Sequence, residues 1–129
     1  MRQLILLLPA AWLLVGCATA PPKPADRPVT HVVVCWLKNP GDAAARARVV
    51  AGARELDRIP GVLRVQSGEC IPSNRPAVVA DYDVAVVMEF ANERALRAYE
   101  QHPAHLAAVR DVLLPLVARY QVFDFVRGH

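Results

Sequence analysis

The sequence has no apolar run that could span a membrane, because its most hydrophobic stretch, residues 4–14, has only eleven residues. A spanning helix needs about 20. None of the three cysteines stands at a Cys-x-x-Cys spacing, which leaves little to indicate a metal site. The 15 lysine and arginine residues are dispersed along the chain, unlike the basic patch of a nucleic-acid-binding protein. We therefore expect no spanning helix, no metal or cofactor, and no nucleic-acid partner.

The N-terminal segment has the pattern of a bacterial secretion signal. Met1-Arg2 gives a positive start, and residues 4–14 have the length of the hydrophobic region of a signal peptide. Leu14-Val15-Gly16-Cys17 then resembles the lipobox of bacterial lipoproteins, which implies cleavage after residue 16 and a lipid on Cys17. By resemblance to sorting signals, Ala18 favours the outer membrane, facing the periplasm. An ordinary signal peptide that happens to contain Cys17 is the alternative.

The residues after the expected cleavage site divide into a linker and one domain. Residues 17–28 contain four prolines and no large apolar residue, which predicts an extended tether. Residues 29–129 are enough for a single domain with one core. We therefore expect a signal peptide over 1–16, a lipidated tether over 17–28 and a folded domain over 29–129.

The domain alternates between strand and helix patterns. Asp42 and Asn92 precede helical stretches and can cap them. After Pro103, apolar side chains at 106, 109 and 113 indicate one buried helical stripe, which Pro115 should end or kink. The predicted strands cover residues 30–38, 62–71, 81–90 and 119–126, and the predicted helices cover 43–59, 93–99 and 103–115.

This order, β-α-β-β-α-β with the last helix in two pieces, predicts an α+β, ferredoxin-like fold. Its helices can cover only one face of the sheet, yet the strand of residues 30–38 is apolar on both faces. We expect a second copy to cover the other face, giving a homodimer through the sheet face, a dimeric α+β barrel. In this topology the third strand separates Cys35 from Cys70 by about 10 Å, so we expect no disulfide within a subunit.

Several motifs together resemble the stress-responsive A/B barrel (Dabb) family. They are His31-Val32-Val33, Ile59-Pro60-Gly61-Val62, residues 82–90, Tyr99-x-x-His102-Pro103-x-His105, and Asp124-Phe125. The resemblance covers about 30–126 and implies a dimeric α+β barrel. One plant member, olivetolic acid cyclase, closes a polyketide without a cofactor. By this resemblance Tyr99 and His105 are candidate catalytic residues, and His31 and His102 are candidate ligand-binding residues.

The residues of the Tyr99–His105 motif also suggest a chemistry. Because the residue before a proline avoids the α-helical conformation, His102 should end one helical piece and Pro103 should begin the next. His105 then lies in a first helical turn, where the helix dipole disfavours a positive charge, so its neutral imidazole could act as a general base. Tyr99 could donate a hydrogen bond to a developing oxyanion. Structural roles are the alternatives, such as a helix cap made by the His102 ring.

We therefore expect a lipid-anchored protein of the bacterial cell envelope that binds a small apolar or aromatic ligand, without an assigned reaction. The first alternative is a cofactor-independent enzyme of the cyclase or lyase kind, with His105 as the base and Tyr99 as its partner. The second alternative is a monooxygenase-like dimeric barrel. Whether His31, Tyr99 and His105 face one enclosed cavity distinguishes a site from three separate structural residues.

Overall fold

The computed structural model describes residues 27–128, so the expected signal peptide, Cys17 and most of the tether lie outside the described residues. The chain forms four strands and several helical segments, joined in the predicted order. The elements are β1 (Val29–Leu37), α1 (Ala43–Glu55), η2 (Leu56–Arg58), β2 (Val62–Glu69), β3 (Val84–Phe90), α2 (Glu93–Glu100), α3 (Pro103–Ala108), η3 (Val109–Leu113), α4 (Leu114–Leu116) and β4 (Val117–Val126).

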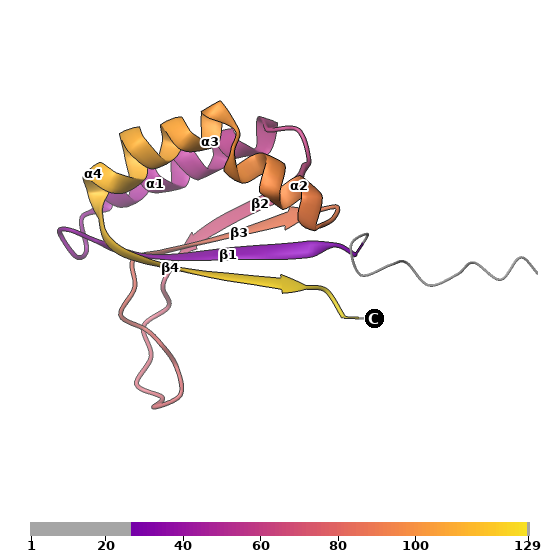
Figure 1. Ribbon diagram of the computed structural model, residues 1–129. Helices are drawn as coiled ribbons and strands as arrows, with labels where there is room; N and C mark the ends of the chain where they lie inside the picture. Colours follow the sequence, from indigo (N-terminus) through magenta and orange to yellow (C-terminus); the bar gives the residue numbers. More distant parts are fainter. Residues whose placement is uncertain (1–26, 129) are drawn as a thin grey trace, which may run out of the picture.

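The four strands form one antiparallel sheet in the order β2-β3-β1-β4, which confirms the ferredoxin-like α+β fold. All helices lie on one face of this sheet, and the loop of residues 70–83 extends from the opposite side (Figure 1). We call that opposite side the open face. β3 lies between β1 and β2, and both Cys35 and Cys70 are free thiols, as predicted.

Local sequence signals set the helix boundaries. Asp42 accepts a hydrogen bond from the Ala45 amide at 2.9 Å and caps α1, and Asn92 accepts one from Ala95 at 3.0 Å and caps α2. Gly61 has a φ of +95°, which glycine adopts without strain, and it turns the chain from η2 into β2. The predicted caps are therefore confirmed.

The core lies between the sheet and the helices. Strand residues of one parity are buried there because successive side chains of a strand alternate between faces. On β3 these are Val84, Val86, Met88 and Phe90, and α1 supplies Val49 and Ala53. Within residues 27–128, no helix is both long and apolar enough to cross a membrane.

The predicted apolar stripe after Pro103 is only partly correct. Leu106 is 51% exposed, whereas Val109 and Leu113 face inward together with Val112. Leu106 precedes η3, which is a π-helical turn. The cavity is lined instead by positions 105, 108, 109, 112 and 113, a helical stripe to one side of Leu106. The helical segment ends at Leu116, one residue after Pro115, which agrees with the predicted end, and β4 begins at Val117.

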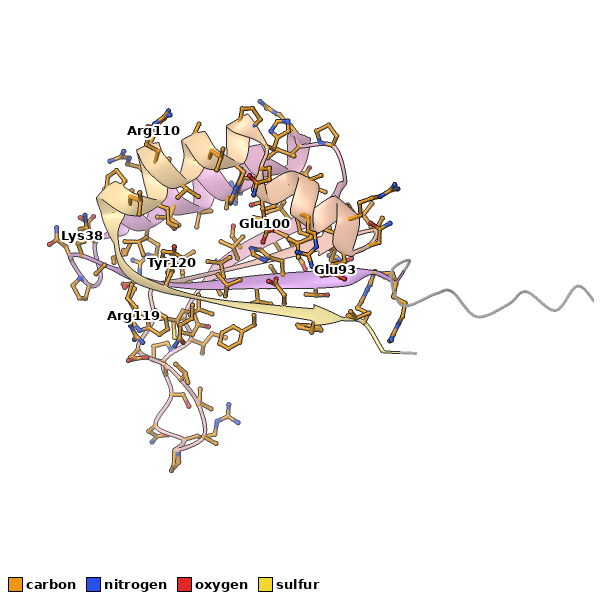
Figure 2. The ribbon with its side chains drawn as sticks, viewed as in Figure 1. Lys38, Glu93, Glu100, Arg110, Arg119 and Tyr120 are labelled. Carbon is orange, nitrogen blue, oxygen red and sulfur yellow. The ribbon has the colours of Figure 1, made fainter. Side chains whose placement is uncertain are left out.

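Beyond the buried Val117, β4 is exposed on both of its faces. Arg119 points away from the helices and Tyr120 points toward them (Figure 2), and both are exposed. On the open face Phe123 and Phe125 are each about half exposed, opposite Val32 and Thr30 of β1. A single copy of the chain therefore leaves a large apolar surface exposed, as the sequence predicts.

Candidate functional site

The Tyr99–His105 motif builds one wall of the site. α2 ends at Glu100, and His102 has an extended backbone with a ψ of 135°. Pro103 then begins α3, and the Nδ1 atom of His102 accepts a hydrogen bond from the Ala104 amide at 3.2 Å. His102 is thus the N-terminal cap of α3, and it is not among the residues that line the cavity described below.

Tyr99 lies at the centre of a cluster of rings. Its side chain is 1% exposed, and its ring centroid lies 4.5 Å from that of His105, 5.0 Å from Phe90 and 6.1 Å from His31. Burial, together with the negative charge of Glu100, raises the pKa of Tyr99. The side chain therefore stays a neutral phenol, which can donate a hydrogen bond.

The hydrogen bond of His105 identifies its tautomer. Nδ1 lies 3.0 Å from the backbone carbonyl oxygen of Glu100. A carbonyl oxygen only accepts hydrogen bonds, so Nδ1 must carry the hydrogen. In the neutral ring Nε2 then has a free lone pair, which is the state that a general base needs.

His31 pairs with an acidic side chain of the neighbouring strand. Its Nδ1 atom lies 2.6 Å from Oδ1 of Asp124, which stands directly opposite it in the β1–β4 pair. The His31 side chain is 8% exposed and that of Asp124 is 43% exposed. Because a carboxylate accepts hydrogen bonds, Nδ1 of His31 carries the hydrogen and Nε2 is again left with the lone pair.

The sequence interpretation quoted Asp124 as part of a family motif but did not assign it to the site. Asp124 is 93 residues from His31 in the chain, and their contact depends on the register between the first and last strands. The available signal was strand parity, because two residues that face the helices from adjacent strands can meet. The pairing register of β4 against β1 cannot be read from the sequence of either strand alone.

These three polar side chains, His31, Tyr99 and His105, line one cavity of about 80 Å³ between the sheet and the helices. Its other walls are apolar and come from β1, β3, α1 and the segment that includes η3. They include Val33, Val49, Leu56, Val86, Met88 and Val112. The structure thus brings together His31, Tyr99 and His105 and leaves His102 outside the lining.

Cys35 also lines the cavity, but as an unreactive group. Burial raises the pKa of its thiol to about 11, so it stays protonated at neutral pH. Within residues 27–128, no three histidine, cysteine or acidic side chains gather as metal ligands would. The chemistry available in this cavity is therefore that of two imidazoles and one phenol in apolar surroundings.

The chain matches the Stress responsive A/B Barrel Domain (Dabb) family over residues 29–127. The protein therefore belongs to the Dabb family. A Dabb protein with a ferredoxin-like fold from Mesorhizobium loti is similar, with 30% identity, a TM-score of 0.67, and coverage of 80% of this chain and 99% of that one. No curated protein sequence matches the chain.

Two more distant structures share the fold. A dimeric ferredoxin-like protein of unknown function from Thermobifida fusca is 22% identical, with a TM-score of 0.63, over 78% of this chain and 92% of that one. A hydroxynitrile lyase from Passiflora edulis is 16% identical, with a TM-score of 0.66, over 81% of this chain and 96% of that one. At these identities the likeness concerns the fold alone.

Proposed function

We propose that this Dabb protein binds a small apolar or aromatic ligand carrying a polar oxygen in the cavity between sheet and helices. The observation that carries this proposal is the convergence of Tyr99, His31 and His105 on an otherwise apolar space of about 80 Å³. An apolar cavity of about 150 Å³ can hold benzene. This smaller cavity therefore takes at most a single ring, with the rest of a longer ligand outside it, and Tyr99 is the hydrogen-bond donor.

Ligand-observed NMR with p-cresol and toluene tests this proposal. The two molecules have similar apolar bodies, but only p-cresol has a hydroxyl group. We expect p-cresol to bind the wild-type protein several-fold more tightly, because one hydrogen bond contributes about 1 kcal/mol. Binding of neither molecule, or equal binding of both, would count against a cavity that recognises a polar oxygen.

The second candidate function is a cofactor-independent enzyme of the cyclase or lyase kind. It is favoured by the tautomers, since both imidazoles have Nδ1 engaged as a donor and Nε2 left as a base. Tyr99, held as a phenol, would stabilise negative charge on a carbonyl oxygen. The sequence assigns the role of base to His105, and His31 is the other imidazole of the cavity.

Exchange of the α-protons of cyclopentanone in D₂O, followed by proton NMR, tests this reaction class without knowledge of the natural substrate. We expect the wild-type protein to accelerate exchange above the buffer rate and Tyr99→Phe to lower the acceleration at least about tenfold. Exchange at the buffer rate in the wild type would leave ligand binding as the function.

We further propose a homodimer through the open face. The half-exposed Phe123 and Phe125 support it, because a monomer would leave this apolar surface in water. The dimeric relative from Thermobifida fusca shares the fold and agrees with this proposal. Pairing of two open faces would place the helices and both cavities on the outside of the assembly.

Finally, we propose that a lipid on Cys17 anchors the protein in the bacterial cell envelope, at the outer membrane and facing the periplasm. The support is the Leu14–Cys17 tetrapeptide after an apolar stretch. Labelling with a radioactive fatty acid tests it: the wild type should take up label and Cys17→Ser should not. Equal labelling of both proteins would contradict lipidation at this residue.

A further inference from the structure

His31 and Asp124 form a buried imidazole paired with a hydrated carboxylate. Register places the two residues opposite each other on β1 and β4, and the 2.6 Å contact joins Nδ1 to Oδ1. The carboxylate is 43% exposed and can remain charged, while the ring is 8% exposed and faces the cavity. If His31 gains a proton at Nε2, the new positive charge is already in contact with a negative one.

His105 lacks this compensation. Its Nδ1 hydrogen bond goes to a neutral backbone carbonyl, and within residues 27–128 no carboxylate lies within ion-pair distance of its ring. His105 also lies in the first turn of α3, where the helix dipole opposes a positive charge. Of the two imidazoles in the cavity, His31 is therefore the one better prepared to become an imidazolium ion.

The second ring nitrogen of His31 is free of other contacts of this kind. The hydrogen bond to Asp124 uses Nδ1, and Nε2 makes no hydrogen bond within residues 27–128. The side chain itself lines the cavity. The Tyr99 ring lies 6.1 Å from the His31 ring, so a small carbonyl compound in the cavity can contact both.

We propose that His31, positioned and charge-compensated by Asp124, is the proton acceptor of the cavity. This inference rests on the proposed enzymatic function. Nε2 of His31 takes the α-proton of a carbonyl compound, and the electron pair of the broken C–H bond forms the carbon–carbon double bond of an enolate. The enolate oxygen receives a hydrogen bond from Tyr99. The proton on Nε2 exchanges with solvent D₂O, and return of a deuteron from Nε2 to the carbon completes the cycle.

The test compares cyclopentanone exchange in single variants of the protein. We expect His31→Gln to lose at least about 100-fold of the acceleration, because general-base catalysis contributes 10² to 10⁴. Asp124→Leu should lose about tenfold or more, as partners that orient a catalytic imidazole do. Asp124→Asn should lose less of the acceleration than Asp124→Leu, because its amide oxygen still accepts the Nδ1 hydrogen. Some loss should remain, because the amide carries no negative charge. His105→Gln should lose less of the acceleration than His31→Gln does. Asp57→Asn, on the exposed surface, is the matched control and should leave the exchange unchanged.

A spectroscopic measurement separates positioning from a general loss of structure. The ¹⁵N shifts of His31 should show hydrogen on Nδ1 in the wild type and in Asp124→Asn, and a mixture of tautomers in Asp124→Leu. Loss of exchange in His105→Gln with retention in His31→Gln would overturn the proposal while leaving the enzymatic function standing. Buffer-rate exchange in the wild type would overturn both. An unchanged tautomer in Asp124→Leu would remove Asp124 from the positioning role.

Discussion

The rings of Tyr99 and His105 lie in contact, with their centroids 4.5 Å apart at an angle of 44° between the planes. The packing holds the phenol and the imidazole on the same wall of the cavity although a helix boundary separates them in the chain. The Tyr99 side chain is buried and lines the cavity, and no hydrogen bond of its hydroxyl is found within residues 27–128. This group is therefore available to a ligand.

The first prediction concerns this hydroxyl. Tyr99→Phe should weaken p-cresol binding about threefold to tenfold, because a hydrogen bond contributes about 1 kcal/mol. The ring contacts remain, so the melting temperature should change by only a few degrees, and toluene binding should not change. Ligand-observed NMR and thermal unfolding measure these effects. An equal loss of toluene binding would mean that the cavity itself had collapsed.

The second prediction concerns the cap of α3. His102→Ala removes the ring nitrogen that accepts from the Ala104 amide, and should lower the free energy of unfolding by about 1 kcal/mol. His102→Asn should recover most of this loss, because asparagine is a strong N-terminal cap. Denaturant titration measures both. Because His102 does not line the cavity, a change in p-cresol affinity in either variant would contradict a purely structural role.

The third prediction concerns the width of the cavity. A Cβ atom at Gly52 of α1 would lie 3.2 Å from Cγ1 of Val112, and both residues line the cavity. Gly52→Ala should weaken p-cresol binding, while the helix preference of alanine offsets part of the crowding in the unfolding free energy. The double variant with Val112→Ala should restore binding. Gly68→Ala, with nothing within 4 Å of its new Cβ, is the control.

The fourth prediction concerns the open face. Phe123→Ser combined with Phe125→Ser should shift the protein from dimer to monomer in sedimentation velocity, because both rings lie in the proposed interface. Leu106→Ser is the matched control, since Leu106 is 51% exposed but belongs to the helical layer. A dimer that tolerates the double change, or that is lost in the control, would contradict pairing through the open face.

The fifth prediction is a dependence of stability on pH. Burial raises the pKa of the Cys35 thiol from 9.0 to about 11, so the folded state holds this proton more tightly than the unfolded chain does. The stability associated with this thiol is present below pH 9 and is lost as the pH rises through about 11. The slope contributed by this thiol is at most about 1.4 kcal/mol per pH unit.

Denaturant titrations between these pH values measure that slope. Cys35→Ser should show a shallower decline than the wild type, whatever its absolute stability. Tyr99, whose pKa is also raised by burial, adds to the decline at the upper end, so Tyr99→Phe should be shallower there as well. Parallel curves for wild type and Cys35→Ser would show that the thiol is not buried in the folded protein.

The features that the sequence predicts correctly depend on local chemistry. Asp42 and Asn92 cap helices because their side chains reach amides only three residues away. Pro103 suits the first position of a helix because its missing amide hydrogen has no partner there in any case. Strand parity predicts the buried side of β3 because alternation is a property of the strand itself. The order of these elements is enough to define the ferredoxin-like topology.

What the sequence does not predict depends on contacts between distant segments. The role of Asp124 follows from the register of β4 against β1, and neither strand encodes that register alone. The exposure of Leu106 follows from which side of this helical segment packs on the sheet and α1, because positions 105, 108, 109, 112 and 113 line the cavity. The apolar character of residues 106, 109 and 113 does not by itself show which of them lies at the edge of the covered stripe.

The π-helical turn at Val109–Leu113 has a consequence for how this protein can diverge. Such a turn contains one more residue than an α-helical turn, so deletion of a single residue could leave a regular helix between the same ends. Each residue turns a helix by about 100°, so the deletion would exchange the side chains that face the cavity from this segment. One deleted codon could thus give a relative with the same sheet and ring cluster but a different ligand preference.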